Sequence, residues 1–130
     1  NLPELAGALR APVLADDPEW LERTRKHLQC ENLLVTLGAD GMALATDQGT
    51  HLRVPAVARS VYDVSGAGDT VTAVMAATLA SGGDVETGAV LATHAAGVEV
   101  GKAGVVTVAP EEILESVTRL EASRGRASGR

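Results

Sequence analysis

Hydrophobic and polar residues in the first half of the chain predict two helices followed by three strands. Residues 4–9 and 18–29 have helical spacing, and Pro18 suits the first turn of the second helix, where its missing N–H is not needed. Residues 33–37 form a short apolar run that ends at Gly38, which predicts a buried strand, parallel to its neighbours and covered by helices on both sides. Residues 42–46 and 51–54, joined by a turn at 47–49, predict a β-hairpin.

The second half of the chain is predicted to be helical. Apolar residues recur at helical spacing over 67–79 and 85–100, with a Ser-Gly-Gly joint between the two segments. Pro110 and the two glutamates after it predict the start of a final helix. Residues 123–130 are polar and lack apolar periodicity, so we expect a disordered tail or linker there. The pattern as a whole predicts an α/β domain over residues 1–122.

Composition supports one domain with a core of small aliphatic side chains. The chain has 130 residues, of which 45% are hydrophobic, yet it contains no Phe, one Trp and one Tyr. Val, Leu and Ala must therefore supply most of the buried surface, which favours helices packed closely on a sheet.

Charge and hydropathy restrict the expected partners. The net charge of −6, without a basic patch that contains aromatic residues, argues against nucleic acid as a partner. The longest apolar run, residues 71–80, is about half as long as a membrane-spanning helix, so we expect no membrane association. Cys30 is the single cysteine and no signal peptide is visible, which together favour the cytoplasm.

Residues 63–70, Asp-Val-Ser-Gly-Ala-Gly-Asp-Thr, carry the most informative chemistry. Glycines at the start of a helix let a ligand approach the backbone, and the free N–H groups of the first turn attract phosphate. A carboxylate at Asp69 would repel a phosphate but could accept a proton from an attacking hydroxyl, so phosphoryl transfer is the leading interpretation. The alternative is a tight loop in which Asp69 is only a helix cap.

Three motifs occur in the order typical of one enzyme family. The Asp-x-x-Gly-Ala-Gly-Asp pattern at 63–69 resembles the C-terminal signature of the ribokinase-like (PfkB) sugar kinases. Residues 1–4, Asn-Leu-Pro-Glu, resemble the family's Asn-x-x-Glu motif, and residues 36–41, Thr-Leu-Gly-Ala-Asp-Gly, resemble its nucleotide loop. Within the family, residues 61–71 resemble the Val-Tyr-Asp-Val-Thr-Gly-Ala-Gly-Asp-Thr-Val of the D-glycero-β-D-manno-heptose 7-phosphate kinases. The resemblance implies the C-terminal part of a ribokinase-like, Rossmann-type three-layer fold with a short β-hairpin insertion.

The resemblance implies ATP as the phosphate donor and assigns roles to particular residues. Asp69 is implied as the catalytic base, and the backbone N–H groups of Gly66, Ala67, Gly68 and Asp69 as the anion hole. The implied nucleotide contacts are Thr36, Gly38 and Gly41 near the phosphates and ribose, and Thr93, His94 and Gly97 near the adenine. Thr93-His94 stands where the heptose kinases usually have Asn-Ala.

The resemblance also implies two cation sites. Asn1 and Glu4 are implied in placing Mg²⁺ through water, as suits a cation that keeps much of its hydration shell. A simple salt bridge or a solvated carboxylate is the alternative for Glu4. Asp63 and the Ser65 carbonyl resemble the family's monovalent-cation site, which would hold K⁺, with the Gly104 backbone as a weaker candidate. His27 and His51 lack metal-ligand partners at useful spacing and are interpreted as surface or structural residues.

The predicted function is ATP-dependent phosphorylation of a sugar phosphate, heptose 7-phosphate to heptose 1,7-bisphosphate. In the family, most of the sugar site and the lid lie in an N-terminal half that this sequence lacks. We therefore expect that missing half in the same or a separate chain. A homodimer, or a nucleotidyltransferase domain after Arg130, is compatible with the resemblance. The alternatives are a ribokinase-like kinase for another sugar or nucleoside, and a non-catalytic nucleotide-binding remnant.

Overall fold

The computed structural model describes residues 1–57 and 61–127, and the chain divides into two compact units, Asn1–Ala56 and Val57–Arg130. The fold is α/β, as predicted. In the described ranges, none of the helices combines the length and the apolar character needed to cross a bilayer.

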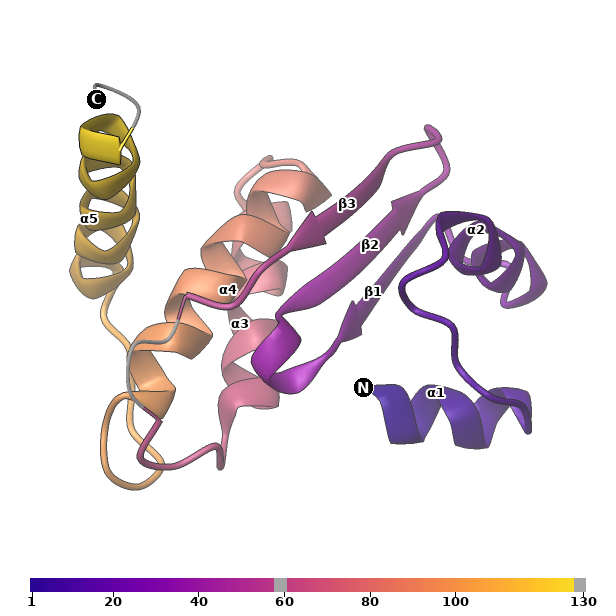
Figure 1. Cartoon of the computed structure of the whole chain (residues 1–130), viewed down its shortest axis with the longest axis horizontal. Helices are drawn as coiled ribbons and strands as arrows, with labels where there is room; N and C mark the ends of the chain where they lie inside the picture. Colours follow the sequence, from indigo (N-terminus) through magenta and orange to yellow (C-terminus); the bar gives the residue numbers. More distant parts are fainter. Residues whose placement is uncertain (58–60, 128–130) are drawn as a thin grey trace. The chain divides into compact units, whose positions relative to one another are not determined.

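The first unit combines two helices with an antiparallel sheet (Figure 1). Its elements are α1 (Leu2–Leu9), α2 (Pro18–His27), β1 (Asn32–Thr36), the 3-10 turn η1 (Gly38–Asp40), β2 (Met42–Thr46) and β3 (His51–Val54). Helix α2 starts where Pro18 predicted, because the Asp17 side chain accepts a hydrogen bond from the Glu19 N–H and caps the helix. The predicted hairpin is confirmed as β2 and β3.

The prediction of a parallel strand at 33–37 was wrong. Strand β1 pairs antiparallel with β2, in a register that sets Asn32 opposite Thr46 and Thr36 opposite Met42. The reason is the short connection through η1, which turns the chain directly back on itself, whereas a parallel neighbour needs a crossover of about a dozen residues or more.

The core of the first unit lies between its helices and one face of its sheet. Leu5 of α1 and Leu21 of α2 are buried together with Val35, Ala43 and Ala45 of the strands. The strand residues alternate along β1 and β2, as expected for side chains that face one side of a sheet. Every residue of β2 is buried, consistent with its central position.

The second unit contains the three helices predicted for the second half of the chain, α3 (Ala67–Ala80), α4 (Val85–Val100) and α5 (Pro110–Ala127). Helices α3 and α4 pack closely because small residues line their contact. Ala89, Ala92 and Ala95 have no exposed surface, and a Cβ added to Gly88 would lie 3.0 Å from the Met75 sulfur. A core without Phe is thus built by bringing backbones close together.

The predicted disordered tail was wrong over residues 123–127. Helix α5 continues to Ala127, and the remaining residues 128–130 lie outside the described ranges. Arg124 and Arg126 occupy the last turn, where positive side chains interact favourably with the negative end of the helix dipole. The domain boundary near residue 122 and the linker role of the C-terminus remain predictions.

Candidate functional site

The turn that precedes α3 leaves backbone N–H groups open to a ligand. Gly66 caps the helix with φ 90°, a left-handed conformation that favours glycine, and no side chain caps this helix start. The Ala67 N–H bonds to the Val64 carbonyl at 3.4 Å and the Thr70 N–H to the Gly66 carbonyl at 2.9 Å. Within the described residues, the intervening N–H groups of Gly68 and Asp69 have no acceptor. They lie at the positive end of a 14-residue helix, an arrangement suited to binding an anion.

Asp63 organises the segment that leads into this turn. Its carboxylate accepts a hydrogen bond from the Ser65 N–H at 2.9 Å, and this bond lowers the pKa of Asp63, so the group stays ionised at neutral pH. The Tyr62 N–H donates to the Val100 carbonyl at 2.8 Å, which ties the segment to the C-terminal end of α4. The structure thus brings Asp63, Ser65 and Asp69 together on one continuous turn.

Asp69 is the free carboxylate of this turn. It stands in the first turn of α3, is exposed, and makes no hydrogen bond or ion pair within the described part of the chain. A carboxylate that is not engaged as a cap or in a salt bridge can accept a proton from a bound ligand. The geometry therefore does not support the alternative in which Asp69 is only a helix cap.

Glu99, which the sequence reasoning missed, lies against the same turn. Only 1% of Glu99 is exposed, and its Oε2 atom has no hydrogen-bond partner in the described residues. A Cβ built on Gly66 would lie 2.5 Å from Glu99 Oε1. A signal was available in the sequence, since Glu99 continues at helical spacing the buried stripe that contains Ala92 and Ala95.

In the first unit, residues 36–41 form a second turn with glycines in left-handed conformations. Gly38 has φ 60° and Gly41 has φ 86°, and the Leu37 N–H bonds to the Gly41 carbonyl at 2.8 Å. Thr36 ends β1 directly before this turn. The structure therefore brings Thr36, Gly38 and Gly41 together, as expected for a compact loop with exposed backbone at Gly38.

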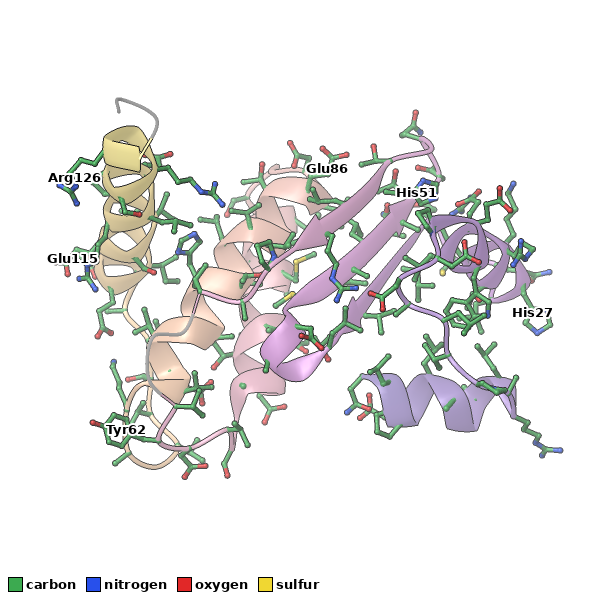
Figure 2. The ribbon with its side chains drawn as sticks, in the orientation of Figure 1. His27, His51, Tyr62, Glu86, Glu115 and Arg126 are labelled. Atoms are coloured by element: carbon green, nitrogen blue, oxygen red, sulfur yellow. The ribbon has the colours of Figure 1, made fainter. Side chains whose placement is uncertain are left out.

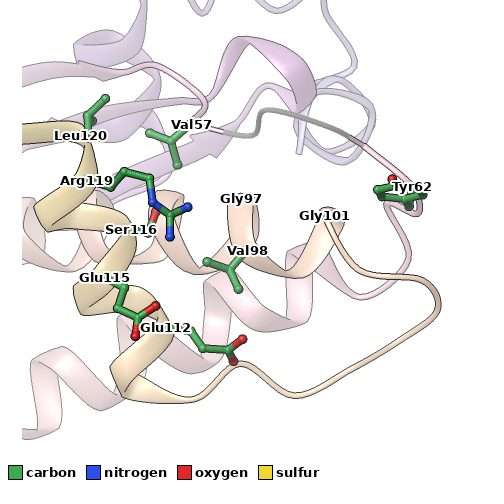
Figure 3. Close-up of a pocket in the computed structure, with 10 residues that line it drawn as sticks. All are labelled: Val57, Tyr62, Gly97, Val98, Gly101, Glu112, Glu115, Ser116, Arg119 and Leu120. Carbon is green, nitrogen blue, oxygen red and sulfur yellow. The ribbon is translucent and has the colours of Figure 1, made fainter. Parts of the chain in front are cut away.

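A cavity of about 430 Å³ lies in the second unit, beside α4 and α5 (Figure 3). It is lined by Val57, Tyr62, Gly97, Val98, Gly101, Glu112, Glu115, Ser116, Arg119 and Leu120. Gly97 is the one predicted nucleotide contact among these residues. The polar groups of α5 were missed, because each one looks like a solvated position on an amphipathic helix.

Thr93 and His94, the other predicted adenine contacts, are buried in α4 and do not line this cavity. The Thr93 hydroxyl donates to the Ala89 carbonyl at 2.9 Å. His94 Nδ1 lies 2.8 Å from the Ser116 hydroxyl of α5, so this ring fastens α5 to α4. Their contact with adenine remains a prediction.

We expect His94 to make the second unit less stable at mildly acidic pH. Burial lowers the pKa of His94 below its ordinary 6.5, with Arg124 adding to the effect and Glu121 opposing it. As pH falls below about 6.5, the unfolded chain binds the proton on this ring more readily than the folded chain does. The free energy of unfolding therefore decreases as pH decreases. Thermal unfolding should show a lower Tm at about pH 5.5 than at about pH 7.5, and His94→Gln should reduce this difference. An equal difference in His94→Gln would contradict this assignment.

The predicted cation ligands have mixed outcomes. The Asn1 side chain accepts the Glu4 N–H at 3.0 Å and so caps the start of α1. The Glu4 carboxylate is exposed and could hold a hydrated cation through water. In the ranges that the structure describes, no three His, Cys, Asp or Glu side chains cluster as metal ligands. His27 and His51 are both exposed (Figure 2), which agrees with the surface alternative of their interpretation.

Comparison with known proteins identifies the family. The profile of the pfkB family carbohydrate kinases matches residues 1–112. The chain belongs to this family. The bifunctional protein HldE of Halorhodospira halophila is 48% identical over 102 residues, which are 76% of this chain and 21% of that protein. HldE of Rhodospirillum rubrum is 40% identical over 125 residues, 95% of this chain and 25% of that protein. The pfkB chain thus spans about a quarter or less of the length of these curated relatives.

Solved structures agree on a ribokinase-like fold. Arabidopsis thaliana ribokinase, determined with ribose and ATP, matches with a TM-score of 0.78 and 26% identity, over 90% of this pfkB chain and 39% of that one. Phosphofructokinase-2 of Escherichia coli matches with a TM-score of 0.79 over 93% of this chain and 39% of that one, at 16% identity, which supports the fold alone.

Proposed function

We propose that this chain is the ATP-binding and catalytic part of a sugar kinase that phosphorylates heptose 7-phosphate to heptose 1,7-bisphosphate. The observation that carries the proposal is the turn at 66–69. Open N–H groups of Gly68 and Asp69 stand beside the free Asp69 carboxylate at the start of α3. Phosphoryl transfer needs this combination of an anion-binding site and a base.

In the proposed reaction the sugar hydroxyl attacks the γ-phosphorus of ATP and ADP leaves. Asp69 accepts the hydroxyl proton as the new P–O bond forms and the bond to ADP breaks. The amides of residues 66–69 stabilise negative charge on the transferring group, which is the larger effect in a loose transition state. Mg²⁺, when bound, neutralises phosphate charge, and Glu4 is its proposed water-mediated ligand.

The remaining predicted residues keep proposed roles around the substrates. Residues 36–41 are proposed to contact the phosphates and ribose of ATP, because glycine at Gly38 leaves open space beside the backbone. The cavity at Gly97 is proposed for the adenine, since one wall is glycine backbone and the opposite wall carries polar groups. Asp63 and the Ser65 carbonyl are proposed to hold K⁺, and the ionised state of Asp63 supports this.

The heptose substrate is supported by identities of 48% and 40% to the two HldE proteins and by the motif at 61–71. Another sugar remains the second candidate, since a ribokinase shares the fold at 26% identity. A non-catalytic remnant is less well supported, because the Gly-Ala-Gly-Asp sequence at 66–69 is intact. The cytoplasmic location remains a prediction.

We also propose that a separate sugar-binding half covers the site, in the same or another chain. Val61, Tyr62, Val64 and Val105 are each at least 61% exposed, and all lie in segments beside the 66–69 turn. Apolar side chains around an anion-binding turn suit burial by a second polypeptide, which would also exclude water from the reaction. The match to only 39% of the ribokinase chain leaves room for such a half.

We expect the 130-residue chain alone to bind Mg-ATP weakly and to lack sugar kinase activity. Without a second half, nothing closes over the sugar and excludes water. Calorimetric titration with Mg-ATP and an ADP-release assay with heptose 7-phosphate would measure both properties. Adding the segment of Halorhodospira halophila HldE that precedes the matched residues should restore turnover. Efficient turnover by the isolated chain would show that the sugar site lies within these residues.

A further inference from the structure

The end of α4 contacts residues 62–69 at two points. We call this segment, which includes the 66–69 turn proposed to bind phosphate, the phosphate-binding turn. The Val100 carbonyl accepts the Tyr62 N–H at 2.8 Å, which holds the start of the turn. The adjacent side chain, Glu99, lies against its end, where a Cβ on Gly66 would be 2.5 Å from Oε1 and 3.3 Å from a Val105 methyl group. Glu99 and Val105 thus fill the space that a side chain at position 66 would need.

A buried carboxylate in this place needs an explanation. Glu99 is among the largest fully buried side chains, and its Oε2 atom has no partner in the described residues. Burying such a group is costly unless it is compensated. The start of α3 offers partial compensation, because the positive end of a helix dipole stabilises a nearby carboxylate. At 1% exposure the side chain is confined, so it cannot simply swing into solvent to admit a Cβ.

We propose that Glu99 is a positioning residue for the phosphate-binding turn. Its carboxylate fills the space behind Gly66 and holds the first turn of α3 so that the Gly68 and Asp69 amides face the ligand. This role depends on the shape of the Glu99 side chain and not on its charge. This inference rests on the proposed function for its ligand, but the contact between Glu99 and Gly66 can be tested without one.

The first test is a thermal-unfolding cycle without ligand. Gly66→Ala should lower Tm by at least about 5 °C more than Gly82→Ala, whose added Cβ meets nothing within 4 Å although Gly82 has a similar φ of 84°. In the Glu99→Ala background, Gly66→Ala should lower Tm by no more than Gly82→Ala does. If Gly66→Ala alone fails to fold, the double variant should recover folding. The proposal would be overturned if Gly66→Ala lowered Tm equally in both backgrounds, or if the double variant did not recover folding.

The second test asks whether the contact positions the turn for phosphate. Glu99→Ala should weaken Mg-ATP binding about tenfold, whereas Glu99→Gln, which keeps the shape, should stay within about twofold of the parent chain. A Glu99→Gln variant as impaired as Glu99→Ala, or one that binds much more tightly, would show that charge dominates and overturn the positioning role. If the parent chain binds no Mg-ATP, the proposed function fails. The unfolding cycle still tests whether Glu99 contacts Gly66.

Discussion

Replacing Asp69 by Asn should lower the phosphorylation rate by at least about 100-fold while Mg-ATP affinity changes by only a few fold. Asn keeps the size of the side chain and the start of α3, but it cannot accept the proton of the attacking sugar hydroxyl. Asp69 is exposed and has no partner among the described residues, so its loss should not disturb the fold. The measurement is sugar-dependent ADP release at saturating ATP, with the chain joined to the segment of Halorhodospira halophila HldE that precedes the matched residues.

Asp84→Asn is the matched control for that experiment. Asp84 also stands at a helix start, but its carboxylate accepts the Thr87 N–H at 2.6 Å and caps α4. Asn caps helices about as well as Asp, so this variant should keep both its stability and its rate. Near-normal turnover in Asp69→Asn would remove Asp69 from the role of catalytic base.

Replacing Gly41 by Ala should destabilise the first unit by about 3 kcal/mol or more. The added Cβ would lie 2.0 Å from the Val54 carbonyl oxygen and 2.6 Å from the Ala56 nitrogen, and both are backbone atoms that cannot move aside cheaply. The φ of 86° adds strain for any residue with a Cβ. Denaturant unfolding followed by circular dichroism would measure the loss.

Gly49→Ala separates the two causes of that loss. Gly49 has a similar φ of 81° in the hairpin turn, but an added Cβ would meet nothing within 4 Å. This variant should therefore lose only the conformational part, about 1 kcal/mol. Equal stabilities for Gly41→Ala and Gly49→Ala would show that close backbone approach at Gly41 does not matter.

The sequence was sufficient to predict the elements whose determinants are local. Pro18, the glycines after α3 and the spacing of apolar residues in α4 act within a few residues, so α2, the hairpin, α3, α4 and the start of α5 were predicted closely. The motif at 63–69 was equally informative, because a glycine-rich turn directly ahead of an apolar helix determines where the open N–H groups lie. Family membership followed from the order of three such motifs.

Pairing and burial, in contrast, were decided by the tertiary structure. The apolar run at 33–37 suits a parallel or an antiparallel strand equally well, and only the tight turn at η1 made β1 and β2 antiparallel. Helical periodicity places Glu99 on the buried stripe of α4, but it cannot show which partner covers a face. The contact of His94 with Ser116 and that of Glu99 with Gly66 could therefore not be predicted. Local sequence determines the conformation of each segment, because backbone preferences act over short distances. The surroundings of a side chain depend on contacts between residues far apart in the chain, and these exist only once the segments have packed.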